Sequence, residues 1–287
     1  MTGRLWVCAT PIGNLGDVTL RVLDALREAD AIIAEDTRIS RRLLARYDIV
    51  TPLERYDEHV ADQRTPGLIA RMSAGQTLAL VSDAGTPGVS DPGARLVDAC
   101  IDVDIAVEVL PGPSAILTAL VASGLPTHAF YFGGFLPRRA GERAALLASV
   151  SSLDATLIFY ESPRRATRTL DSIADALPGR RAALARELTK MHEEVVRGSI
   201  EEVASEISGR PELKGEIVLL IGPRTAAEKV VEVDRDAACE RVDRLRAQGL
   251  SMRDAIKRVS EESGIPRNLV YEAAHRPKHG GTRATSS

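Results

Sequence analysis

The stretch LALVSDAGTPGVSDPG, residues 78–93, decides how the rest of the chain is interpreted. Residues 78–81 are an apolar run of strand length, and the twelve residues that follow contain three Gly and two Pro. Gly and Pro at this density force a tight, irregular turn, so we expect its backbone amides and carbonyls to be open to a ligand. The alternative is an ordinary strand-to-helix connection, which needs only about two to six residues.

Length and composition place the chain among ordinary globular proteins. Its 287 residues are enough for two domains and a small third unit, and it is 44% hydrophobic and 27% charged. Aromatic residues make up 3%, which argues against a surface that stacks many bases on rings. The net charge is −3, yet residues 241–287 hold ten Lys and Arg against five Asp and Glu. This basic end suggests an appended element with a polyanionic partner.

The cysteines and the hydropathy pattern bear on the compartment. Cys8, Cys100 and Cys239 are far apart in the sequence and have no metal-ligand or disulfide spacing, so we expect a reducing, cytoplasmic setting. The N-terminal apolar run is too short for a signal peptide, and no stretch has the length of a membrane helix. The sequence therefore predicts a protein that needs neither membrane nor metal.

The first 125 residues alternate between strand and helix patterns. The expected strands are 5–10, 31–34, 78–81 and 106–110, and the expected helices include 40–47, 67–74 and 115–123. This alternation predicts an α/β domain, residues 1–125, with a mostly parallel sheet. Each strand ends in a Gly- or Pro-rich loop, so these loops should gather at the carboxyl edge of the sheet, where α/β proteins bind ligands.

The second half predicts another α/β domain, residues 126–224, with a mixed sheet. Residues 128–136 (HAFYFGGFL) are interpreted as a Gly-rich join between the domains. Residues 225–233 are interpreted as a polar linker. The expected strands are 155–160, 181–188, 193–197 and 215–221, and the expected helices are 165–177 and 200–207.

A helical extension is predicted over residues 234–276. A helix to about residue 248, a second from 251, a turn at Gly264–Asn268 and a short helix at 269–274 resemble a helix-turn-helix unit. Its basic excess fits nucleic-acid contact, but a helical cap or a dimerisation hairpin has the same pattern. The sequence does not decide between these alternatives.

Several common site motifs are missing from the sequence. The first loop reads PIGNLG instead of G-x-G-x-x-G, and neither a phosphate-binding G-x-x-x-x-G-K-[ST] nor a G-x-S-x-G elbow occurs. The five histidines form no metal pattern. What remains are loops of small, mostly uncharged residues at 11–16, 83–92 and 111–114. They suit a ligand held through the backbone, such as an adenosyl moiety, better than a triphosphate.

Six motifs in one order carry a resemblance to a known family: TPIGNLGDVTLRVLDALREAD, AEDTRISRRLL, LVSDAGTPGVSDPG, VLPGPSA, FYESPRR and RELTKMHEE. Over about residues 4–222 the chain resembles the tetrapyrrole methylase superfamily, and most closely its ribosomal RNA branch. The resemblance implies two α/β domains with S-adenosyl-L-methionine in the cleft between them, and a homodimer. It also implies 2′-O-methylation of a decoding-centre cytidine, with 16S rRNA or the small subunit as partner.

The same resemblance implies a set of cofactor-binding residues. Tetrapyrrole-modifying members usually have Asp where this chain has Thr86. At this position we therefore expect the cofactor to be contacted by the backbone and not by a side-chain carboxylate. The set falls on Pro11, Gly13, Ala84, Gly85, Thr86, Pro87, Val89, Ser114 and Ala115, with Tyr160 and Leu188 on the opposite wall.

Methyl transfer to a hydroxyl requires positioning and a group that helps the hydroxyl lose its proton. The candidates beside strand ends are Asp36, Glu161, Glu187 and Lys190, a lysine being suitable if its pKa is lowered. The alternative is that Glu187 and Lys190 simply form ion pairs, with Arg186, Arg38 or Arg164 as partners, and that positioning carries much of the catalysis.

Arginines near the loops are the candidates for RNA binding, because guanidinium groups bind phosphate in a forked geometry. Their alternative is a set of solvated helix faces. Two rival functions also remain: methylation of a tetrapyrrole or other small molecule, and a non-catalytic RNA-binding assembly factor. The arginine candidates are Arg38, Arg41, Arg42, Arg138, Arg139, Arg164 and Arg165, with Arg46, Arg143 and Arg168 in the same clusters.

Overall fold

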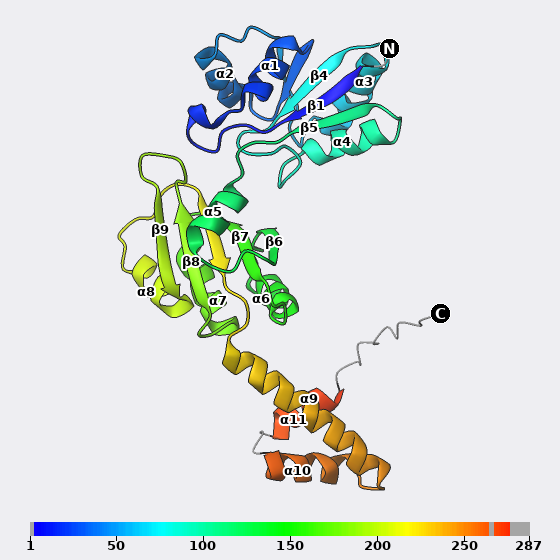
Figure 1. Cartoon of the computed structure of the whole chain (residues 1–287), viewed down its shortest axis with the longest axis vertical. Helices are drawn as coiled ribbons and strands as arrows, with labels where there is room; N and C mark the ends of the chain where they lie inside the picture. Colours follow the sequence, from blue (N-terminus) through cyan, green and yellow to red (C-terminus); the bar gives the residue numbers. More distant parts are fainter. Residues whose placement is uncertain (1–2, 264–266, 276–287) are drawn as a thin grey trace. The chain divides into compact units, whose positions relative to one another are not determined.

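The structure is a computed structural model that describes residues 3–263 and 267–275 (Figure 1). The chain divides into two compact units, Met1–Pro223 and Arg224–Ser287. The first unit contains two five-stranded sheets, and the described part of the second unit is helical. The two sheets expected for the predicted domains 1–125 and 126–224 therefore both lie within the first unit, which ends one residue earlier, at Pro223.

The first sheet is parallel throughout, with the strand order β3-β2-β4-β1-β5. This confirms the mostly parallel sheet that the alternating pattern predicts. Its three inner strands, β2, β4 and β1, are nearly continuous apolar runs because helices cover both faces, whereas the edge strand β3 has the sequence Leu-Glu-Arg. The bounds are β1 Arg4–Cys8, β2 Ala31–Ala34, β3 Leu53–Arg55, β4 Thr77–Val81 and β5 Ala106–Leu110.

Four helices cover the two faces of the first sheet. One apolar cluster joins α1 (Leu20–Glu28) and α2 (Thr37–Arg46) to one face, and another joins α3 (Ala61–Ser73) and α4 (Gly93–Ile101) to the other. A short 3-10 turn, η1 (Leu15–Asp17), precedes α1. Helices α2 and α3 begin earlier than the sequence predicts. Since the sheet is covered on both faces, only its edges and the loops at the strand ends can bind ligands.

The second sheet is mixed, as predicted, with the order β6-β7-β10-β8-β9. Only β6 and β7 run parallel, and the other neighbours are antiparallel. The bounds are β6 Phe130–Phe135, β7 Thr156–Glu161, β8 Arg181–Arg186, β9 Glu194–Ser199 and β10 Ile217–Ile221.

The interpretation of residues 128–136 as a join is wrong, because most of this segment is strand β6. Its pairing with β7 shifts register between Phe132 and Phe135, and Gly134 has a φ of +63°. The two glycines of FYFGGF therefore form an irregularity within a strand. A glycine pair inside an aromatic run indicates such a bulge as readily as a loop.

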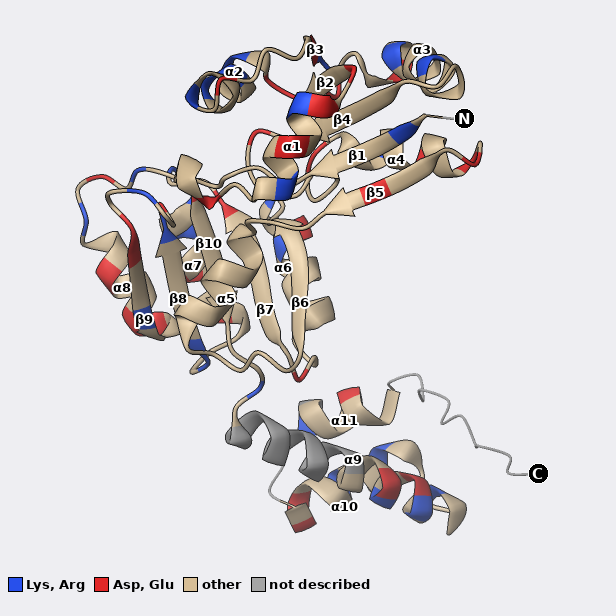
Figure 2. Ribbon diagram, turned by 45° about the horizontal axis from the view of Figure 1, so that its top comes forward, with Lys and Arg blue, Asp and Glu red and all other residues tan. Residues whose placement is uncertain are grey.

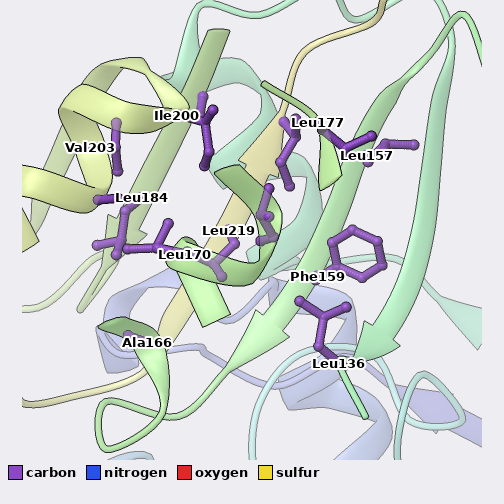
Figure 3. Packing of buried hydrophobic residues seen from close by; sticks show 14 of the residues in the cluster. Leu136, Leu157, Phe159, Ala166, Leu170, Leu177, Leu184, Ile200, Val203 and Leu219 are labelled. Atoms are coloured by element: carbon purple, nitrogen blue, oxygen red, sulfur yellow. The ribbon is translucent and has the colours of Figure 1, made fainter. Parts of the chain in front are cut away.

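The second sheet is also covered on both faces. Helices α6 (Ala140–Val150), α7 (Ala166–Ala176) and α8 (Ile200–Ser208) pack on one face, where Phe159, Leu170 and Leu219 are fully or almost fully buried (Figure 3). Helix α5 (Ala115–Ser123) packs on the other face, in a cluster that also includes Ile12 of the first loop. The first loop is thus anchored on the second sheet.

The described part of the second unit contains α9 (Ala226–Ala247), α10 (Met252–Ser263) and α11 (Arg267–His275), which share an apolar core that includes Val242, Ile256 and Val270. The prediction of a linker at 225–233 is wrong, because α9 begins at Ala226. Of the predicted turn, residues 264–266 lie outside the described residues, as does residue 276. No helix in the described ranges combines the length and apolarity needed to cross a membrane.

Candidate functional site

The first and central loops are joined by hydrogen bonds at the carboxyl edge of the first sheet. The amide of Thr10 donates to the carbonyl of Gly85 (2.8 Å), and the amide of Gly85 donates back to Thr10 (3.0 Å). The Thr10 hydroxyl also donates to the carbonyl of Ser82 (3.0 Å). Gly85 has a φ of +80°, which L side chains rarely adopt, so this position requires glycine.

A cavity of about 420 Å³ opens beside this junction. It is lined by the loops of the first sheet and by strand ends and loops of the second sheet. Among the predicted cofactor residues, Pro11, Gly13 and Pro87 do not line it, although Ile12 does. Those that do line it are Ala84, Gly85, Thr86, Val89, Ser114, Ala115, Tyr160 and Leu188.

Gly13 lets the first loop approach the segment after β8. A Cβ atom at Gly13 would lie 2.6 Å from Cγ of Lys190 and 2.6 Å from the hydroxyl of Thr189. The next amide, that of Asn14, donates to the same Thr189 hydroxyl (3.0 Å). The glycine is therefore explained by close packing behind the cavity wall.

The backbone of this segment is strained. Glu187 and Thr189 have φ values of +51° and +65°, which is uncommon for residues with side chains. The segment is held by a bond from the Thr189 amide to the Glu193 carboxylate (2.6 Å) and one from the Lys190 amide to the Glu187 carbonyl (3.0 Å). Backbone strain of this kind clusters at functional sites, which fits its position beside the cavity.

The cavity is acidic, although the sequence predicts loops with few charges. Among the described residues that line it there are five carboxylates and no Lys, Arg or His. Such a lining disfavours phosphate groups and favours cations and hydrogen-bond donors. The described residues also hold no group of three or more His, Cys, Asp or Glu arranged for a metal ion. The carboxylates are Glu35, Asp83, Asp91, Glu161 and Glu216.

Glu35 and Asp83 follow the ends of two neighbouring parallel strands. Ala34 of β2 pairs with Val81 of β4, so the residues after them emerge side by side. The backbone amide of Asp36 donates to the Asp83 carboxylate (3.0 Å). Burial raises the pKa of Glu35, and the Asp83 and Asp91 carboxylates add to the effect. Burial also raises the pKa of Asp83, so neither carboxyl gives up its proton as readily as an exposed one.

Asp36, predicted as a candidate base, has a structural role at the start of α2. Its carboxylate accepts from the Arg38 amide (2.8 Å) and pairs with the Arg38 guanidinium (2.6 Å). These hydrogen bonds from Arg38 lower the pKa of Asp36 to about 2. Asp36 does not line the cavity, and its strongly acidic carboxyl makes a weak base.

Glu161 lines the cavity, but its carboxylate is completely buried and fully engaged. It accepts from the Ser162 amide (2.7 Å), the Arg165 guanidinium (2.8 Å) and the Thr169 hydroxyl (2.7 Å). Arg165 also donates to the carbonyl of Leu136 (2.5 Å). This network fastens β6, β7 and α7 together, so Glu161 and Arg165 belong to the scaffold.

Glu187 and Lys190 form a small network at the rim. The Lys190 ammonium donates to Glu187 (3.0 Å) and Glu216 (3.1 Å). Partial burial favours the neutral amine, but these two hydrogen bonds outweigh it and raise the pKa of Lys190. The same bond from Lys190 lowers the pKa of Glu187. A lysine base needs a lowered pKa, so these contacts favour an ion pair over a base, although its partners are Glu187 and Glu216 and not the arginines that the sequence predicts.

The predicted RNA-binding arginines differ in their exposure. Arg143 is buried and donates to two backbone carbonyls and to Ser172, Arg38 is paired with Asp36, and Arg139 is paired with Glu142. Helix α2 carries a row of exposed arginines, seen in blue in Figure 2. Among the predicted arginines and their cluster neighbours, the exposed ones for which the described structure shows no ion pair are Arg41, Arg42, Arg46, Arg138, Arg164 and Arg168.

Comparisons with known proteins agree with this geometry. Residues 4–204 match the family Tetrapyrrole (Corrin/Porphyrin) Methylases. A Mesorhizobium japonicum protein named Ribosomal RNA small subunit methyltransferase I is 50% identical over 80% of this chain and 79% of its own length. A protein of the same name from Halalkalibacterium halodurans is 44% identical over 95% of this chain and 95% of its own length. Another from Bacillus subtilis is 39% identical over 95% of this chain and 94% of its own length.

Solved structures show the same fold. The methyltransferase CobJ superposes with a TM-score of 0.60 at 22% identity, over 77% of this chain and 95% of its own. The uroporphyrin-III C-methyl transferase of Thermus thermophilus, solved in complex with S-adenyl homocysteine, superposes with a TM-score of 0.54 at 21% identity. That match covers 77% of this chain and 97% of the other. The likeness confirms the predicted fold class.

Proposed function

The chain belongs to the tetrapyrrole methylase family, among the proteins named ribosomal RNA small subunit methyltransferase I, and we propose that it methylates the RNA of the small ribosomal subunit. The methyl donor is S-adenosyl-L-methionine. The acceptor is the ribose 2′-hydroxyl of a cytidine in the decoding centre of 16S rRNA. The observation that carries this proposal is the acidic cavity at the junction of the Gly- and Pro-rich loops.

The residues of the cavity fit this cofactor. A volume of about 420 Å³ lies in the range of small-molecule sites. Ile12, Leu188 and Val218 supply apolar surface for an adenosyl group, and the loops after β4 and β5 present backbone amides and carbonyls. The lining carboxylates suit the positive charges of a sulfonium and an ammonium group. When bound, the cofactor supplies a methyl group on a sulfonium, and the protein supplies orientation and charge.

The RNA is held outside the cavity. A cavity lined by carboxylates repels phosphates, whereas the exposed Arg41 and Arg42 of α2 and Arg164 before α7 have no recorded carboxylate partner in the described ranges. Because the net charge of the chain is −3, attraction of a phosphate backbone depends on such local groups. Residues 241–287, with ten Lys and Arg against five Asp and Glu, add a further candidate segment.

We extend the proposal to a homodimer that acts in the cytoplasm. Helix α5, AILTALVAS, contains no charged residue, yet Leu117 and Val121 are 53% and 74% exposed. Helices that are apolar all round are normally buried, so a second copy is expected to cover this face. Cys8 and Cys100 are buried thiols that form no disulfide, as in proteins of a reducing compartment.

The test is methyl transfer from radiolabelled cofactor to small subunits, and to free 16S rRNA, that lack the modification. We expect label in a single cytidine. Because a 2′-O-methyl group blocks alkaline cleavage of the adjacent phosphodiester, the labelled nucleotide should be recovered within an alkali-resistant dinucleotide.

Other outcomes decide between the rival functions. Label in a base would contradict the ribose assignment, and label only in a supplied tetrapyrrole would favour the small-molecule enzyme. RNA binding without any transfer would favour a non-catalytic assembly factor.

A further inference from the structure

A second cavity adjoins the first, and the two share part of their lining. It has a volume of about 420 Å³ and lies between the central loop and the starts of α3 and α4. Glu35, Ser90 and Asp91 line both cavities. These three residues therefore lie at the boundary of the two cavities, where they can contact a ligand in either one. The remaining lining residues are Glu58, Ala61, Pro92, Ala94 and Arg95.

Of the shared residues, Glu35 is the carboxylate that the surrounding structure engages least. Asp91 accepts from the amides of Gly88 (2.6 Å) and Gly93 (2.8 Å), which shapes the central loop. Asp83, next to Glu35, accepts from the Asp36 amide. Glu35 accepts a backbone hydrogen bond from Asp83 and has no ion pair with any described Lys or Arg. It is available to a hydroxyl group.

The surroundings of Glu35 keep it a stronger base than an exposed carboxylate. Burial raises its pKa first, and the nearby Asp83, Asp91 and Asp57 carboxylates add to the shift. Glu58 and Arg95 are the other charged groups in the second cavity, and Arg95 is paired with Asp62. A general base works best when its pKa approaches the working pH, which is the direction of this shift.

We propose that Glu35 accepts the proton of the attacking ribose hydroxyl, and that the second cavity receives the nucleoside that carries this hydroxyl. This inference rests on the proposed function. The hydroxyl oxygen forms a bond to the methyl carbon as the bond from that carbon to the sulfonium sulfur breaks. The electron pair of the broken bond stays on sulfur, which becomes a neutral thioether. The hydroxyl proton passes to the Glu35 carboxylate and then to water.

The chemistry of the second cavity fits a nucleoside better than a phosphate. Carboxylates accept hydrogen bonds from the exocyclic amine of cytosine and from ribose hydroxyls. Three carboxylates line the cavity, and its one arginine, Arg95, is already paired. The phosphates on either side of the nucleoside would remain at the arginines outside.

The test compares Glu35→Gln with the wild type in single-turnover transfer to unmodified small subunits, between pH 5 and pH 9. Glutamine keeps the shape of the side chain but does not accept the proton. We expect the rate at neutral pH to fall about 100-fold or more, and the loss of rate toward low pH to disappear. Glu35→Asp should recover part of the rate. Glu28→Gln, on the exposed face of α1, is the control and should match the wild type.

Two further measurements on Glu35→Gln separate chemistry from folding. Its affinity for S-adenosylhomocysteine, measured by calorimetry, should change less than about threefold, and its urea midpoint should not fall. The role of Glu35 would be overturned if the rate of Glu35→Gln stayed within about threefold of wild type, or if its rate still fell toward low pH as the wild-type rate does. The proposed function would stand in either case. A wild type that transfers no methyl group to RNA would overturn the proposed function, and this inference with it.

Discussion

The carboxylates on the two sides of the cavity differ in whether they form ion pairs. On the second-sheet side, Glu161 is bound by Arg165, and Glu187 and Glu216 are bound by Lys190. On the first-sheet side, Glu35, Asp83 and Asp91 have no ion pair with any lysine or arginine in the described ranges. The pKa of Glu187 is lowered by its hydrogen bond from Lys190, whereas burial raises the pKa of Glu35.

This difference indicates a division of roles. A paired, buried carboxylate holds structure in place, and its partner keeps it ionised and unreactive. A carboxylate without a cation, next to other carboxylates, costs stability and retains affinity for protons. Natural proteins keep such groups where reactions need them, so the second sheet is interpreted as scaffold and the first as the reactive side.

The largest expected effect comes from breaking the scaffold side at Glu161. Glu161→Ala leaves Arg165 and Thr169 without their shared acceptor in the protein interior. We expect a loss of about 3–5 kcal/mol in the free energy of unfolding, measured by urea denaturation. Glu142→Ala, which removes an exposed pair with Arg139, is the matched control and should cost less than about 1 kcal/mol. Equal losses in the two variants would contradict the structural role of Glu161.

A smaller effect, with a defined pH dependence, is expected at Glu194 in β9. Hydrogen bonds from Arg210 and then Arg186 lower the pKa of Glu194 to about 2. The ionised Glu194 therefore stabilises the folded state at pH values above the ordinary pKa of a glutamate. This stabilisation is lost as the pH falls from about 4.5 toward 2. Glu194→Gln should lower the free energy of unfolding at pH 7 by about 1–2 kcal/mol, after allowance for solvent screening, and flatten this acid loss.

Glu35→Gln should change stability in the opposite direction. Since the pKa of Glu35 is raised in the folded state, its ionised form is destabilising, and stability rises as the pH falls through the folded pKa. Removing the charge should therefore raise the urea midpoint at pH 7. Two results would contradict the contrast between the first-sheet and second-sheet sides. One is a Glu35→Gln variant less stable than the wild type, and the other is a Glu194→Gln variant that loses stability toward low pH as the wild type does.

The smallest effects are expected from the exposed arginines. Replacing Arg42 and Arg164 with Ala should weaken binding of small-subunit RNA several-fold at about 0.1 M salt. It should also reduce the slope of log affinity against log salt by about one to two. Affinity for S-adenosylhomocysteine should not change. Arg165→Ala is the comparison, because it should act mainly through stability. A larger loss of cofactor binding than of RNA binding in the double variant would contradict the assignment.

Much of the fold followed from local patterns. Apolar runs before Gly- and Pro-rich loops located β1, β2, β4 and β5 of the first sheet, because a strand covered on both faces has no polar side. The short edge strand β3 was not predicted, because its sequence, Leu-Glu-Arg, contains no such run. The aromatic strand β6 was misread because its two glycines sit in an irregular pairing. The start of α9 was misread as a linker although AAEKVVEV consists largely of residues that tolerate a helix well.

The site was harder to predict because its cavity is lined by loops and strand ends that lie far apart in the sequence. In AEDTR, Glu35 directly follows a strand whereas Asp36 directly precedes a helix, which is the N-cap position. That local signal separates the two carboxylates, but sequence reasoning chose Asp36. Nothing local shows that Arg165 also reaches the carbonyl of Leu136, or that β2 and β4 are neighbours, which places Glu35 beside Asp83.

The most direct test of the central claim is backbone hydrogen exchange with and without S-adenosylhomocysteine. If the loops at the carboxyl edge of the first sheet hold the cofactor, amides in residues 82–89 and 114–116 should exchange more slowly when it is bound. Amides of α9 and α10 should not change. Unchanged exchange in both loops, at a cofactor concentration that saturates the protein, would contradict the account.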